Sequence, residues 1–61
     1  MDKLLTADEV ADILGVPLAT VYQWRSRSVG PRGYRVGRHL RFREIDVEMW
    51  LEAQHDPRPV A

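Results

Sequence analysis

The chain has 61 residues, nine basic and nine acidic, for a formal net charge of zero, and it has no cysteine. A domain of this length buries only about 60% of its unfolded surface, which leaves no room for a substrate cleft beside a core. The lack of cysteine excludes disulfides and thiolate-held zinc, and the apolar runs are too short to cross a bilayer. We therefore expect a soluble intracellular binding domain, not an enzyme, with no cofactor. Its core should come from the largest side chains, which are Tyr22, Trp24, Tyr34, Phe42 and Trp50.

The basic residues are concentrated in one segment of the chain. That segment has seven arginines and no acidic residue: Arg25, Arg27, Arg32, Arg35, Arg38, Arg41 and Arg43. The other 42 positions hold two basic and nine acidic residues. A basic stripe in a neutral chain indicates an oriented contact with a polyanion. Since arginine forks onto phosphates and guanines, DNA is the leading candidate partner.

The first predicted helix covers residues 7–14. Thr6 and Glu9 have the spacing of a capping box, in which each side chain satisfies a backbone donor at the helix start. An apolar face with helical spacing follows, formed by Val10, Ile13 and Leu14. Gly15 can take a positive φ and end the helix.

A second helix is predicted over residues 18–27, with Pro17 in its first turn, where the missing N–H costs nothing. Val21 and Trp24 should form its inward face. Two short helices joined by a turn of three or four residues that contains glycine have the spacing of a helix-turn-helix.

Residues 34–42 alternate polar and apolar side chains around Gly37, which predicts a β-hairpin. A two-residue turn, 37–38, would suit glycine at the first central position. A three-residue loop, 37–39, instead places Tyr34, Val36, Leu40 and Phe42 on one face. We favour the second register, because register is set chiefly by keeping the apolar side chains on the buried side.

The favoured register has a consequence for the arginines of the hairpin. It places Arg35 and Arg41 opposite each other on the outer face, near Arg38 at the tip. Like charges directly across a strand pair are destabilising. An anionic partner that arrives between them would explain the arrangement.

The last predicted helix begins near Arg43-Glu44. Its apolar face should contain Val47, Trp50 and Leu51, with Ile45 at its start. Its outer face is acidic and contains Asp46, Glu48 and Glu52. This face is either a solvated surface or a contact with another protein. The domain should then span residues 4–54, followed by a flexible tail, 55–61. The two histidines, His39 and His55, lack the spacing of a metal site.

The candidate recognition surface is the outward face of the second helix. It contains Ala19, Thr20, Tyr22, Gln23, Arg25 and Arg27. Glutamine can pair bidentately with adenine, and arginine can bind guanine or phosphate. We favour base contacts for Gln23 and Arg27. We then expect Thr20, Tyr22 and Arg25 to contact the DNA backbone, since phosphate contacts outnumber base contacts. The alternative is an ordinary solvated helix face.

The candidate second contact is the hairpin and the residue that follows it. Its basic or polar side chains are Arg35, Arg38, His39, Arg41 and Arg43. These side chains either hold DNA phosphates or only keep an exposed hairpin soluble. We favour phosphate contacts, because the segment 25–43 that carries these side chains has no acidic residue.

Several sequence motifs resemble the excisionase-type DNA-binding family, a winged helix-turn-helix group related to the DNA-binding domains of MerR regulators. The opening resembles it at 4–6, 9–11 and 14–16, and Thr20 to Trp24 is similar to its T-V-Y-x-W motif. The hairpin matches at 34–38 and 41–42, and the closing helix matches at 46–47 and 50–51. The chain departs from the family at Pro17, usually serine, and at Leu18-Ala19, often polar or basic.

The resemblance implies a mainly α fold with a small β-hairpin wing, in the order α-α-β-β-α. It also implies that the second helix enters the major groove of duplex DNA, while the wing contacts the backbone and the minor groove. An excisionase would bind and bend DNA beside an attachment site and direct an integrase towards excision. The brevity of the chain, without an effector domain, favours this role.

The split between the basic segment and the acidic remainder predicts head-to-tail self-association on DNA. The resemblance, which implies cooperative assembly, points the same way. We expect the protein in the cytoplasm of a bacterial host, at the nucleoid. Two other functions stay open. One is a stand-alone transcriptional regulator of the same fold. The other is a protein-interaction module whose arginines bind an acidic partner.

Overall fold

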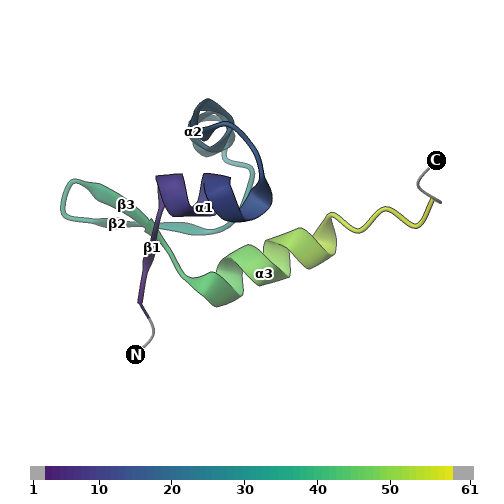
Figure 1. Cartoon of the computed structure of the whole chain (residues 1–61). Helices are drawn as coiled ribbons and strands as arrows, with labels where there is room; N and C mark the ends of the chain where they lie inside the picture. The colour runs from purple at the N-terminus through teal and green to yellow at the C-terminus, as the bar shows by residue number, and fades with distance from the viewer. Residues whose placement is uncertain (1–2, 59–61) are drawn as a thin grey trace.

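The computed structural model describes residues 3–58 and has the predicted winged helix-turn-helix architecture (Figure 1). The helices are α1 (Ala7–Leu14), α2 (Leu18–Ser26) and α3 (Glu44–Ala53). The strands are β1 (Leu5–Thr6), β2 (Gly33–Val36) and β3 (His39–Phe42), which form an antiparallel sheet in the order β1-β3-β2. The two-residue β1 adds a third strand to the predicted hairpin, with Leu5 opposite Phe42 and Thr6 opposite Arg41.

Helix α1 has the predicted bounds and caps. The Thr6 hydroxyl accepts the Glu9 N–H at 3.1 Å, and Glu9 Oε1 accepts the Thr6 N–H at 3.0 Å. Gly15, at φ 67°, ends the helix. The predicted apolar face is wrong in one respect, because Ile13 is 56% exposed. The buried side is formed instead by Ala7, Val10 and Ala11, whose small alanines let neighbouring elements approach α1 closely.

Helix α2 ends one residue earlier than predicted, at Ser26. Pro17 is its N-cap residue in an extended conformation (φ −62°, ψ 147°), not a residue of the first turn. The Pro17 carbonyl still accepts the Thr20 N–H at 2.9 Å. The inward face is confirmed, since Val21 is buried and Trp24 is half-buried.

The hairpin has the two-residue turn, and the register favoured from the sequence is wrong. Val36 lies opposite His39, Arg35 opposite Leu40, and Gly33 opposite Phe42. Gly37 has a φ of 63° while Arg38 has a negative φ, the pattern of a type II′ turn. One face of the hairpin therefore carries the buried Phe42, and Val36 is 49% exposed on the other.

Gly33 explains this register. A Cβ at this position would lie 3.0 Å from Leu40 Cδ1 and 3.2 Å from Phe42 Cε2. The buried face therefore carries two apolar side chains from β3, and a glycine of β2 leaves them the space. The sequence argument assumed that both strands contribute apolar side chains to the same face, and β2 does not.

The core lies between the helices and the sheet. Its buried members are Ala7, Val10, Ala11, Val21, Phe42 and Val47. Of the five large aromatic residues predicted to build it, Phe42 is buried and Tyr22 is 52% exposed. Trp24 and Trp50 are half-buried and pack against each other, with ring centroids 4.8 Å apart and planes tilted by 46°.

Helix α3 begins where predicted, but its inward face differs. Val47 is buried and Trp50 packs on Trp24, whereas Ile45 and Leu51 are 45% and 52% exposed. Asp46, predicted on the outer face, is half-buried, and its Oδ2 is buried without a hydrogen-bond partner among residues 3–58. The inward side of α3 is therefore formed by Val47 and Trp50, with Trp50 against Trp24 of α2.

The predicted tail, 55–61, lies outside the described residues from position 59 onwards. No helix within 3–58 combines the length and the apolar character that a membrane span requires.

Candidate nucleic-acid interface

The exposed face of α2 has helical spacing and runs through Ala19, Tyr22, Gln23 and Ser26. Ser26 was not among the predicted residues, although the same spacing would have identified it. Thr20 is half-buried at the edge of this face. Arg27 is the C-cap residue of α2, so its side chain leaves the helix at its end. The surface offers an amide, a phenol and a hydroxyl, which can bind base edges or phosphates.

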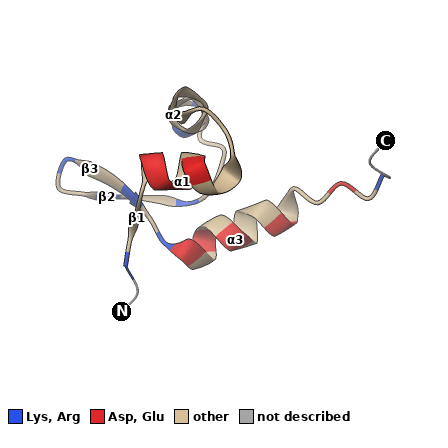
Figure 2. Ribbon diagram, viewed as in Figure 1, with Lys and Arg blue, Asp and Glu red and all other residues tan. Residues whose placement is uncertain are grey.

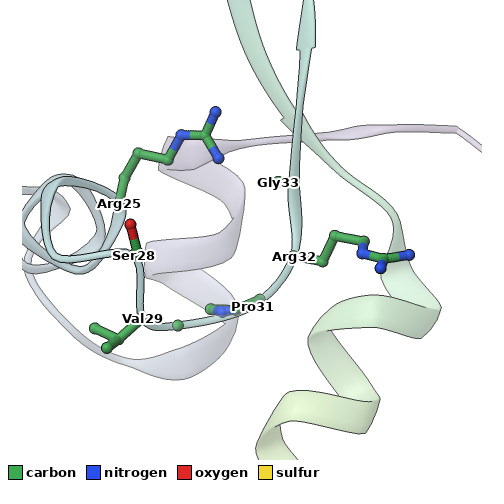
Figure 3. Close-up of a pocket in the computed structure, with 7 residues that line it drawn as sticks. Arg25, Ser28, Val29, Pro31, Arg32 and Gly33 are labelled. Carbon is green, nitrogen blue, oxygen red and sulfur yellow. The ribbon is translucent and has the colours of Figure 1, made fainter.

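Arg25 links α2 to the wing. Its Nη1 lies 3.4 Å from the position that a Cβ on Gly33 would occupy. Figure 3 shows its side chain extending from α2 towards Gly33, at the start of β2. The Arg25 guanidinium therefore lies on the same face of β2 as Leu40 and Phe42, close to Gly33.

The two faces of the wing carry different arginines. Arg35 lies opposite Leu40, so it shares the face of Phe42, which packs towards α2. Arg41 lies opposite Tyr34 on the other face, and its Nη1 donates a hydrogen bond to the Leu40 carbonyl at 2.9 Å. The expectation that Arg35 and Arg41 face each other is therefore wrong, because the two-residue turn offsets the strands by one position.

The remaining predicted wing residues lie at its ends. Arg38 is in the turn, and His39 begins β3 opposite Val36; both are exposed. Arg43 is the N-cap residue of α3, beyond the wing. The structure thus brings Arg25 and Arg35 to the same side of the sheet, and it separates Arg41 from them.

The loop between α2 and β2 is closely fitted to the helix. The Val29 N–H donates to the Trp24 carbonyl at 2.9 Å, and Pro31 is buried. Gly30, at φ 86°, lies so close to Trp24 that a Cβ would be 2.9 Å from the Trp24 Cβ. The loop 28–33 and Arg25 line a hollow of about 580 Å³ (Figure 3). The sequence indicated only a turn here, because this fit depends on tertiary contacts.

Charge is divided between regions of the molecule. Figure 2 shows acidic residues along α1 and α3, and basic residues on α2 and the hairpin. The ion pairs Lys3–Glu9 (3.7 Å) and Arg58–Asp56 (2.8 Å) both lie outside segment 25–43. Within residues 3–58, the guanidinium groups of Arg25, Arg35 and Arg38 have no hydrogen bond or ion pair. They are available to an external anion.

The same described stretch has no group of three or more His, Cys, Asp or Glu that could hold a metal ion. The chemistry of this surface is therefore that of charge and hydrogen bonding.

Comparison with known proteins identifies the family. A family model described as a helix-turn-helix domain matches residues 4–55. Neither a curated protein nor a solved structure gave a match. The chain belongs to this helix-turn-helix domain family, and the membership supports DNA as its partner.

Proposed function

We propose that this helix-turn-helix protein is an excisionase, a factor that binds and bends duplex DNA beside an attachment site and directs an integrase towards excision. The observation that carries the DNA-binding part is the grouping of arginines on α2 and on the α2-facing side of the wing. The motifs shared with excisionases, from the opening segment to the closing helix, support the specific role.

The exposed face of α2 would enter the major groove, where Gln23 can pair with adenine. Arg25 and Arg35, both on the side of the sheet that faces α2, would then hold the phosphates of the strand beside the groove. Arg38 extends this contact at the tip of the wing. The additional contacts that the wing makes with curved DNA would offset the free-energy cost of bending.

The test combines footprinting of the DNA that flanks the gene with an excision assay. Protection beside an attachment site, a position-dependent gel shift that reports a bend, and excision only when protein and integrase are both present are the expected results. Protection over a promoter, with changed transcription and no effect on excision, would identify a transcriptional regulator instead. Loss of duplex retention at moderate salt, with retention of an acidic protein, would point to an interaction module.

We also propose head-to-tail association of neighbouring copies on DNA. The outer side of α3 combines Ile45 and Met49, 45% and 65% exposed, with the exposed acids Glu48 and Glu52. The outer face of the wing combines the exposed Val36 with His39 and Arg41, so the two surfaces complement each other in charge and in apolar character. Asp46 no longer belongs to this surface, whereas Asp8 and Asp12 of α1 offer another acidic contact. A contact of this kind repeats without closing, as adjacent DNA sites require.

The test is a titration of DNA with one site against DNA with two or three adjoining sites. Tighter per-site binding on adjoining sites is expected for the wild type. The double variant Glu48→Gln/Glu52→Gln should lose this gain and keep its single-site affinity. Equal per-site affinity of the wild type on all DNAs at low salt would rule the association out. An integrase contact through α3 and the tail would be tested by co-retention with the integrase.

A further inference from the structure

We propose that Arg25 and Ser28 form a seat for one phosphodiester group, at the junction of α2 and the wing. The phosphate would belong to the DNA strand that passes between these two elements. The inference rests on the proposed DNA-binding function and specifies one contact within it, which includes a residue that no sequence motif indicated.

A solvent-open hollow lies at this junction. It measures about 580 Å³ and is bounded by Arg25 on one side and by the loop 28–33 on the other. In Figure 3 the Arg25 guanidinium and the Ser28 hydroxyl point to the same side of the loop. A guanidinium and a hydroxyl together supply several donors to the oxygens of one phosphate.

The backbone of Ser28 is the second observation. Its φ is 58°, and it is the single residue other than glycine with a positive φ in residues 3–58. Glycine adopts this conformation without steric cost, whereas serine does not. The left-handed residue ends α2, with the Val29 N–H donating to the Trp24 carbonyl at 2.9 Å. What serine adds at this position, compared with glycine, is its hydroxyl group.

The exposed Arg25 side chain reaches the start of β2, with its Nη1 3.4 Å from where a Gly33 Cβ would be. Arg35 lies two positions further on the same face of β2, and no acidic residue occurs between positions 25 and 43. The local potential therefore favours an anion. Arg32 also lines the hollow, but its side chain extends away from Arg25, towards the start of α3 (Figure 3).

The first test is the salt dependence of duplex binding by Arg25→Gln. Loss of one phosphate contact should lower the slope of log K against log salt by about 0.9. The affinity should fall by the same factor on the protein's own site and on a duplex of unrelated sequence. Arg58→Gln is the matched control, because Arg58 is exposed and paired with Asp56 at 2.8 Å, outside the basic segment. It should leave the slope unchanged.

The second test is Ser28→Gly, which removes the hydroxyl and also relieves the backbone. The variant should have a higher melting temperature than the wild type and yet bind every duplex more weakly, by roughly ten- to a hundredfold for one hydrogen bond to a charged group. Equal or tighter DNA binding would show that Ser28 has no part in the seat and would overturn the proposal.

The outcomes for Arg25 separate the two proposals. If the wild type binds duplex DNA but Arg25→Gln has an unchanged slope, the seat is wrong and the DNA-binding function stands. A loss confined to one DNA sequence would make Arg25 a base contact and would also overturn the seat. If the wild type binds no duplex DNA, the proposed function itself is wrong, and the seat with it.

Discussion

The α2–wing region and α3 differ in both charge and packing. The first carries unpaired arginines on a framework that is closed by Val21 and Phe42, which are each 2% exposed. Helix α3 carries acids on its outer side, and Val47 is its one buried residue. In Figure 1 it leads away from the hairpin, below α1. A surface of unpaired arginines suits contact with the phosphates of a duplex, whereas an acidic helix with exposed apolar side chains suits contact with another protein.

The two tryptophans connect these regions. Trp24 belongs to α2 and also packs against Gly30 of the loop, while Trp50 belongs to α3. A tilted aromatic pair contributes about 0.5–1.5 kcal/mol beyond its buried area. Together with Val47, this contact fixes α3 on the rest of the domain. Each of the following changes tests whether the two regions differ as described.

The largest effect should come from the core of the α2–wing region. Phe42→Ala removes a buried ring and should cost ~3–5 kcal/mol, comparable to the whole stability of a domain this small. Met49→Ala, at a position of α3 that is 65% exposed, should change stability by less than about 0.5 kcal/mol. Urea unfolding followed by circular dichroism would measure both. Similar losses in the two variants would contradict the difference in packing.

Two glutamines allow a matched comparison of DNA contact. Gln23→Ala should cost ~1–3 kcal/mol on the protein's own site and little on random DNA, because adenine pairing is lost. Gln54→Ala changes an exposed amide at the end of α3, where its Nε2 donates to the Trp50 carbonyl at 3.4 Å, and should leave both affinities intact. Fluorescence anisotropy on the two duplexes would measure the affinities. Equal losses for Gln23→Ala on both would assign it to the DNA backbone.

The helix starts offer a smaller contrast. Helix α1 has a capping box, whereas α3 begins at Arg43 without a side-chain cap. Thr6→Ala should therefore destabilise the domain by about 1 kcal/mol. Chemical denaturation would measure the loss. A loss well below about 1 kcal/mol would show that the capping box has no special role.

The capping box also makes stability depend on pH. The hydrogen bond from the Thr6 N–H, with the nearby Lys3 charge, holds the pKa of Glu9 below its ordinary value of 4.5. The pKa of Glu9 is lower in the folded state than in the unfolded state. The contribution of this carboxylate to the stability of the fold is therefore complete above pH 4.5 and is lost as the pH falls through the lowered value. The variant Glu9→Gln should lack this part of the loss of stability at acid pH. An unchanged profile between pH 5 and 2 would contradict the assignment.

The smallest effect should separate the two faces of the wing. Arg35→Ala should lower the salt slope of duplex binding by about 0.9, as expected for one lost phosphate contact. Arg41→Ala should change the slope little on a single site, because Arg41 lies on the face away from α2 and already donates to the Leu40 carbonyl. Equal slopes for the two variants would mean that DNA contacts both faces.

The sequence alone determined the features that depend on short spacings. The Thr6–Glu9 pair and Gly15 set the ends of α1, and the distance between the two first helices identified the helix-turn-helix. The arginine segment indicated the anionic partner. The helix signals lie within a few neighbouring residues, whose backbone preferences are local, and the charge of a segment can be read directly from its composition.

The tertiary structure decided which side chains are buried and which arginines share a face. Ile13, Ile45 and Leu51 are apolar but exposed, whereas Ala7, Ala11 and Val47 are buried, because burial depends on which side of each helix meets the rest of the fold. The wing register depends on the space that Gly33 leaves for Leu40 and Phe42. Apolar alternation allowed both registers, and a shift of one residue moves a side chain to the opposite face. The position of Arg35 beside Arg25 was therefore fixed only by packing between segments far apart in the chain.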